Sequence, residues 1–117
     1  MQEFLRLTEN ILKQDVEAMY HRYFYERKFD RKNYDDFNLM KEEATPIFDK
    51  IEKWEKDANQ IVHKLPLFPN QIKNTLDNLE IMILHSYFND VRKKRFMELY
   101  QSVKYNMNLI LDEHMTE

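Results

Sequence analysis

The stretch "TPIFDKIEKWEKDANQIVHKL", Thr45 to Leu65, carries apolar residues at the spacing of an α-helix. The apolar positions are alternately four and three residues apart, which is the period of one helix face packed in a bundle: Ile47, Ile51, Trp54, Ala58, Ile61 and Leu65. Thr45 followed by Pro46 predicts the start of this helix, with an N-cap hydroxyl and then proline at the first helical position. The prolines of "LPLFPN", Leu65 to Asn70, predict its end and the start of the next helix.

Similar apolar stripes run through the rest of the chain. They predict helices over about residues 3–28, 46–64, 70–88 and 93–114, with a short extra helical segment at about 34–43. Four long amphipathic helices with short connections bury their stripes best side by side. We therefore expect an all-α fold, an antiparallel up-down-up-down four-helix bundle in a single domain covering residues 1–117.

The third predicted helix must end before residue 90. If it continued, Asp90 would lie in the middle of the apolar face, where a carboxylate without a partner is costly. The chain should therefore turn between about Asn89 and Lys93, and Asp90 is the expected N-cap of the last helix.

The composition excludes several kinds of catalytic site. The chain of 117 residues has no glycine, so it lacks phosphate-binding loops and nucleophile elbows, which need that residue. It also has no cysteine, which excludes disulfides and thiolate chemistry. Ser86 and Ser102 are its only serines, and both fall within predicted helices. His85 and Ser86 point about 100° apart as helix neighbours, so they cannot form a nucleophile–base pair.

No segment of the sequence predicts contact with a membrane. The longest aliphatic run, Ile81 to Leu84, is far shorter than the ~20 residues of a membrane-spanning helix. The first residues alternate charged and apolar side chains, unlike a secretory signal. We expect a cytoplasmic protein.

Several short motifs resemble the YppE-like family of small proteins from Gram-positive bacteria. They are "YDDF" (34–37), Trp54, "LHSYF" (84–88), "KKRF" (93–96) and "SVKY" (102–105). The similarity runs from about Asp15 to Glu113, and its most specific part is "HSYFNDVRKKRF". The resemblance implies a four-helix bundle in a bacterial cytoplasm. It implies no activity, cofactor or catalytic residue, because the family has no assigned function. Pro46 departs from the family pattern.

Cations gather at one end of the expected bundle. In that topology the connection at 26–36 lies beside residues 89–95, which places eight cations and five carboxylates together, a local charge of +3 against −6 for the rest. The candidate binding residues are Arg27, Lys28, Arg31, Lys32, Arg92, Lys93, Lys94 and Arg95, with the aromatic Tyr87 and Phe88. This end is either a solvated helix corner, a surface for a protein partner, or a site for nucleic acid or another polyanion.

The sequence favours neither of two possible metal sites. Di-metal bundles use Glu-x-x-His pairs, and this chain has only Glu17 and His21, spaced by four. A magnesium-dependent hydrolase would use helix-borne carboxylate pairs, for which the candidates are Glu52 with Glu55 and Asp77 with Glu80.

We expect no metal, no cofactor and no enzymatic activity. We predict a helical module that binds another macromolecule, most simply a protein. The sequence leaves its oligomeric state open.

Overall fold

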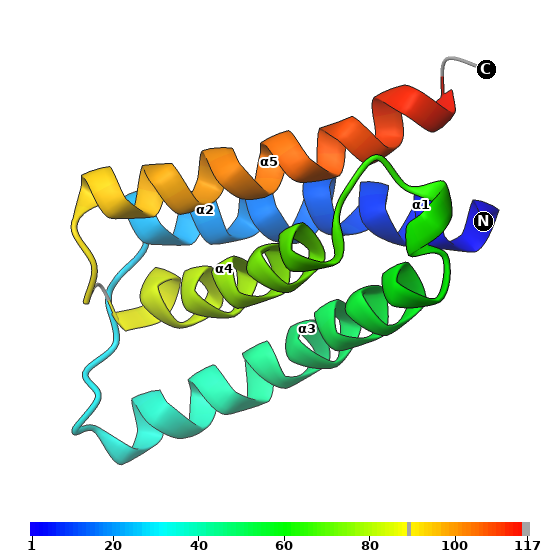
Figure 1. Cartoon of the computed structure of the whole chain (residues 1–117). Coiled ribbons are helices and arrows are strands. Elements are labelled where there is room, and N and C mark those ends of the chain that lie inside the picture. The colour runs from blue at the N-terminus through cyan, green and yellow to red at the C-terminus, as the bar shows by residue number, and fades with distance from the viewer. Residues whose placement is uncertain (89, 116–117) are drawn as a thin grey trace.

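The computed structural model describes residues 1–88 and 90–115, and every regular element in that part of the chain is helical. The elements are α1 (Gln2–Asn10), η1 (Ile11–Val16), α2 (Glu17–Tyr25), α3 (Tyr34–Gln60), η2 (Val62–Lys64), α4 (Pro69–Phe88) and α5 (Lys93–Met115). Figure 1 shows that α1, η1 and α2 form one continuous rod, so four long helical segments make up the described chain. The prediction of an all-α fold is confirmed.

Helix α3 differs from the prediction. A short segment at 34–43 and a separate helix starting at 46 were expected, but one helix runs from Tyr34 to Gln60 with Pro46 inside it. Thr45 is not its N-cap, because its hydroxyl donates to the Lys41 carbonyl oxygen one turn earlier, at 2.6 Å. The helix continues because buried Met40, Ala44 and Ile51 extend one apolar stripe across the proline. The true N-cap is Asn33, whose Oδ1 accepts from the Asp36 amide at 3.0 Å.

The other helix ends are close to their predicted positions. Helices α4 and α5 begin and end within one residue of the predicted bounds. Helix α2 ends at Tyr25, before the predicted residue 28, because Glu26 is extended with φ −107° and ψ 159°. Helix α3 ends at Gln60, and the short 3₁₀ turn η2 follows it. The early end of α2 places Lys28 in the connection rather than on the helix.

The segment η1 is a π-helical stretch that the sequence did not predict. Such segments are rare and widen the helix by one residue. Lys50 of α3 spans this stretch: its ammonium group lies 2.7 Å from the Asp15 carboxylate and also contacts the side chain of Asn10.

A chain of hydrogen bonds pairs the polar groups around Trp54 in the core. The Trp54 side chain is fully buried, and its Nε1 donates to Thr8 Oγ1 at 2.9 Å. The Thr8 hydroxyl in turn donates to the Phe4 carbonyl oxygen at 2.8 Å, and the Phe4 ring stacks on Trp54. This chain of contacts joins α1 to α3 without leaving a buried donor unpaired.

The connection between α2 and α3 lies against the end of α4. The Phe29 amide donates to the Tyr87 carbonyl oxygen at 2.8 Å, and the Tyr23 hydroxyl donates to the Val91 carbonyl oxygen at 2.6 Å. Asp90 is not the N-cap of α5, which begins at Lys93; its carboxylate contacts Arg31 instead. The chain does turn between α4 and α5, with Asn89 outside the described residues.

Candidate interaction site at the basic corner

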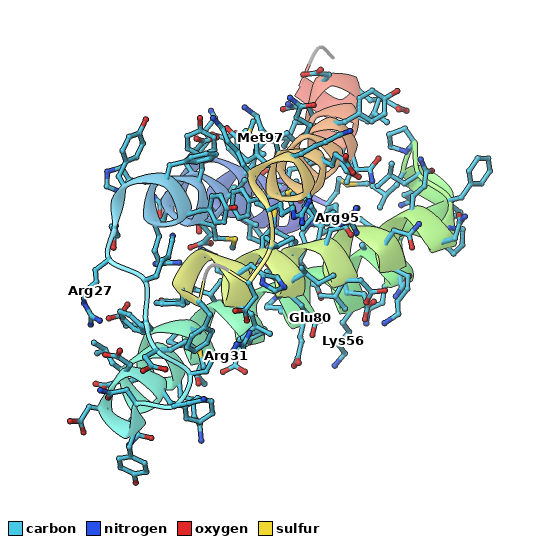
Figure 2. The ribbon with its side chains drawn as sticks, turned by 90° about the vertical axis from the view of Figure 1, so that its left-hand side faces the viewer. Arg27, Arg31, Lys56, Glu80, Arg95 and Met97 are labelled. Atoms are coloured by element: carbon cyan, nitrogen blue, oxygen red, sulfur yellow. The ribbon has the colours of Figure 1, made fainter. Side chains whose placement is uncertain are left out.

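Residues 26–33 and 90–95 meet at one end of the molecule, and we call them the basic corner. All eight predicted cations belong to it: Arg27, Lys28, Arg31, Lys32, Arg92, Lys93, Lys94 and Arg95. Figure 2 faces this end and shows Arg27, Arg31 and Arg95 at different places around it. The two connections were predicted to lie side by side, and the contact between Arg31 and Asp90 joins them.

Arg27 is engaged by a carboxylate of α3. Its guanidinium donates to both oxygens of Asp36, at 3.0 and 3.3 Å, and lies over the Phe29 ring. Asp36 also accepts from the Asp30 amide. The hydrogen bonds from Arg27 and from that amide lower the pKa of Asp36, and Asp36 raises the pKa of Arg27. Arg27 therefore attaches the connection between α2 and α3 to Asp36 in the first turn of α3.

Lys28 is a structural cation. Its ammonium group donates to the carbonyl oxygens of Arg22, at 2.8 Å, and Ser86, at 3.2 Å. Both carbonyls lie in the last turn of a helix, where a cation is favoured, and the Arg22 carbonyl oxygen also accepts from the Glu26 amide at 3.2 Å. Burial and the nearby charge of Arg22 lower the pKa of Lys28. This lysine links the ends of α2 and α4.

Tyr87 and Phe88 are part of the core. They are 1% and 6% exposed, and the Phe29 ring packs against both. The Tyr87 hydroxyl lies 3.1 Å from Glu43, and burial raises the pKa of Tyr87 to about 12. Neither ring presents an open face on which a nucleobase could stack.

The remaining cations are held less tightly. Arg31 contacts Asp90 and lies over the Phe88 ring. Lys93 lies over the Phe24 ring, and Arg95 is 3.6 Å from Glu98. Within residues 1–88 and 90–115, no hydrogen bond or ion pair engages the exposed side chains of three other cations: Lys32, Arg92 and Lys94. The corner therefore combines cations that hold the fold together with cations that face solvent.

An open pocket of about 410 Å³ lies at the corner. Tyr23, Asp90, Val91, Arg92 and Lys93 line it. Two of the predicted cations, Arg92 and Lys93, are therefore lining residues of one pocket.

Two residues that shape the corner were absent from the predicted site. The Arg22 guanidinium donates to Ser86 Oγ at 2.8 Å and lies over the Tyr87 ring. The ring of Tyr23 stacks on Phe96, with centroids 4.0 Å apart. Both lie on the inner side of α2, and a helical wheel could have indicated Arg22 as a cation facing the core.

The carboxylates of α3 and α4 form no metal site in the described part of the chain. There, no group of three His, Asp or Glu side chains is close enough to hold a metal ion. Glu80 does lie near other carboxylates. Its pKa is raised by partial burial and by the charges of Asp77, Glu52 and Glu55. Among the described helices, none is long and apolar enough to cross a membrane.

Fold and site together define a class: a small all-helical protein whose candidate site is a cationic corner. The chain belongs to the family of a bacterial domain of unknown function, DUF1798, whose family model matches residues 8–114. The resemblance identified from the sequence motifs is thereby confirmed.

The similar proteins include the uncharacterized protein YppE of Bacillus subtilis (strain 168). It is 28% identical over 115 residues, which cover 96% of this chain and 92% of that protein. A crystal structure of the same YppE matches with a TM-score of 0.79 at 22% identity, over 98% of this chain and 94% of that one. Its solution NMR structure matches with a TM-score of 0.76 at 22% identity, over 97% and 93%. These likenesses support the fold, and nothing in the family description or the names suggests an enzyme.

Proposed function

We propose that this protein is a non-enzymatic cytoplasmic module that binds an acidic surface of another protein through the basic corner. The observation that carries the proposal is that Lys32, Arg92 and Lys94 are exposed and make no ion pair with any described residue. Exposed cations at the rim of an interface speed the association of an acidic partner and disfavour the binding of basic ones.

The burial of Tyr87 and Phe88 removes the two predicted stacking rings from the corner, although Tyr34 and Phe37 at the start of α3 are exposed. Single-stranded nucleic acid is held by stacking its bases on open aromatic faces as well as by cations. Tyr87 and Phe88, the predicted aromatic residues, are buried. An acidic protein surface needs only the cations, and those are available.

The proposal includes the antiparallel up-down-up-down order of the helices in one domain. Asn78 contacts Ser102, and Thr75 contacts Asn106, so residue numbers fall along α4 as they rise along α5. Lys50 contacts Asp15, and Trp54 contacts Thr8, which gives the same relation between α3 and the rod of α1, η1 and α2. With this order, the connection between α2 and α3 and the connection between α4 and α5 form the basic corner together.

Site-specific photo-crosslinking in bacterial cells tests the proposal. A photoreactive amino acid replaces Lys94 in one strain and, as the matched control, exposed Lys64 of η2 in another. The proposal predicts a discrete adduct from position 94, absent from position 64, with a protein whose crosslinked surface is acidic. If both positions give the same background, or if the adduct surface is basic, the proposal is wrong.

A second candidate is the binding of nucleic acid or another polyanion, and the pocket lined by Arg92 and Lys93 favours it. Its test is fluorescence anisotropy of labelled single-stranded and duplex oligonucleotides at low and high salt. Binding that weakens steeply with salt and disappears on reversing Lys32, Arg92 and Lys94 to glutamate would support this candidate. Flat titrations would exclude it.

A further inference from the structure

A row of half-buried aromatic rings lies along the seam between α2 and α5. The Tyr20 ring centroid is 4.7 Å from that of Phe24 on the same helix and 4.8 Å from that of Tyr100 on α5. None of the three is fully buried, unlike their neighbours Tyr23 and Phe96, which stack beneath them. The three rings therefore form a partly exposed aromatic strip along the seam.

One end of this strip is cationic and the other is neutral. Lys93 lies over the Phe24 ring and also lines the corner pocket, together with Arg92 and with Asp90, whose carboxylate pairs with Arg31. At the far end, Lys104 lies 3.7 Å from Glu17, and the Tyr100 hydroxyl donates to the same carboxylate at 2.8 Å. The positive charge is thus free only where the strip meets the basic corner.

We propose that the aromatic strip along the seam between α2 and α5 is a docking surface for an acidic amphipathic helix of the partner protein. This inference rests on the proposed function and specifies its partner. Apolar side chains of the docked helix lie over Phe24, Tyr20 and Tyr100, and its carboxylates lie at the end marked by Arg92 and Lys93. Charge complementarity at that end fixes the direction of the helix.

The dimensions of the seam suit a helix of about three turns. From Lys93 to Lys104 the α5 axis rises roughly 16 Å, at 1.5 Å per residue. Met97 belongs to the same flank of α5, since it lies four residues after Lys93 and three before Tyr100. Figure 2 shows Met97 and Arg95 on different sides of α5. A helix in a groove is recognised by apolar anchors at such i, i+3, i+4 and i+7 spacings.

Selection from a random-peptide display library on the intact protein tests this inference. We expect enrichment of peptides with helical apolar spacing and acidic residues grouped at one end. The best peptide is then synthesised, and its affinity is measured for the wild type and for Met97→Glu, which places a negative charge in the seam. Gln101→Glu, four residues further along α5 and exposed, is a second variant if Met97→Glu folds poorly.

The matched control is Ser102→Glu, which makes the same charge change on the flank of α5 that contacts Asn78 of α4. The inference predicts that a seam variant weakens peptide binding at least about tenfold, whereas Ser102→Glu leaves it within about twofold. Circular dichroism and thermal melting confirm that each variant folds.

The other outcomes separate this inference from the proposed function. Acidic peptides could bind the seam variants as tightly as they bind the wild type and yet fail to bind Arg92→Glu/Lys94→Glu. That result would support binding at the basic corner and would overturn the seam inference. If no acidic peptide is enriched, both are overturned. If a labelled oligothymidylate binds instead and binds Met97→Glu more weakly, the seam is a nucleic-acid site and the inference of a docked helix is wrong.

Discussion

The ammonium nitrogen of Lys28 lies 3.2 Å from the backbone carbonyl oxygen of Ser86, 58 residues further along the chain. The same nitrogen donates to the Arg22 carbonyl oxygen, so one side chain satisfies backbone acceptors at the ends of two helices. A cation that the sequence offered as a binding residue therefore holds the basic corner together. Lys32, Arg92 and Lys94, by contrast, make no ion pair with a described residue.

Removing the ammonium group of Lys28 should destabilise the fold. Lys28→Met keeps the aliphatic stem but leaves two carbonyl acceptors without a charged donor, which we expect to cost about 1–2 kcal/mol of unfolding free energy. Lys32→Met, at an exposed position nearby, should change it by less than about 0.5 kcal/mol. Urea unfolding of both variants measures the difference. Equal effects would mean that the two carbonyl contacts of Lys28 do not stabilise the fold.

The hydroxyl of Thr8 should be essential for stability. Thr8→Val leaves the buried Trp54 indole N–H without its acceptor, so we expect a loss of about 1–3 kcal/mol. The same substitution at exposed Thr45 removes only a bond to the Lys41 carbonyl oxygen and should cost less than about 0.5 kcal/mol. Thermal melting compares the two. If Thr8→Val and Thr45→Val have the same melting temperature, the hydrogen bond from Trp54 to Thr8 does not stabilise the fold.

Replacing the proline inside α3 should stabilise the protein. Pro46 has no amide hydrogen to donate to the Glu42 carbonyl oxygen, and a proline in a helix interior costs about 3 kcal/mol relative to alanine. Pro46→Ala should therefore raise the unfolding free energy by about 1–3 kcal/mol. Pro69→Ala, at the first residue of α4 where proline is well tolerated, serves as the control and should not stabilise. Destabilisation by Pro46→Ala would show that the chain depends on a kink there.

Stability should fall as the pH drops below about 6.5. Burial lowers the pKa of His85 below its ordinary value of 6.5, with Arg31 adding to the effect and Asp90 opposing it, and its buried Nδ1 has no hydrogen-bond partner among the described residues. The unfolded chain therefore takes up a proton at a higher pH than the folded one, which favours unfolding as the pH falls.

The difference between the wild type and His85→Gln isolates this effect. Unfolding free energies measured from pH 8 to about pH 5 should fall more steeply for the wild type. His63→Gln, at an exposed position of η2, should follow the wild-type curve. Parallel curves for the wild type and His85→Gln would contradict the claim that protonation of buried His85 destabilises the fold.

The regular part of the fold could be predicted from the sequence, and the exceptions have local causes. Apolar periodicity gave the bounds of α4 and α5, because their stripes end where charged residues begin. It misplaced the start of α3, because the Thr45–Pro46 start signal was overridden by the apolar stripe that continues through the proline. It did not reveal the π-helical segment η1, where Lys50, far away in the sequence, contacts Asp15.

The candidate site could be located but not resolved from the sequence. The clustering of cations followed from chain topology. Which of them are free depended on tertiary contacts, such as the pairing of Arg27 with Asp36 and of Arg31 with Asp90. The burial of Tyr87 and Phe88 likewise became visible only once Phe29 was seen to cover them.

The central claim is that the unpaired cations of the basic corner bind acidic polypeptide. The most direct test is the anisotropy of a labelled oligoglutamate peptide, titrated at low salt with three proteins. They are the wild type, the Lys32→Glu/Arg92→Glu/Lys94→Glu variant, and the control Arg6→Glu/Lys56→Glu/Lys64→Glu. The control makes the same change in net charge at exposed cations elsewhere on the molecule. We predict that the corner variant binds at least about tenfold more weakly than the control. Equal weakening in both variants would show that only net charge matters and would contradict the claim.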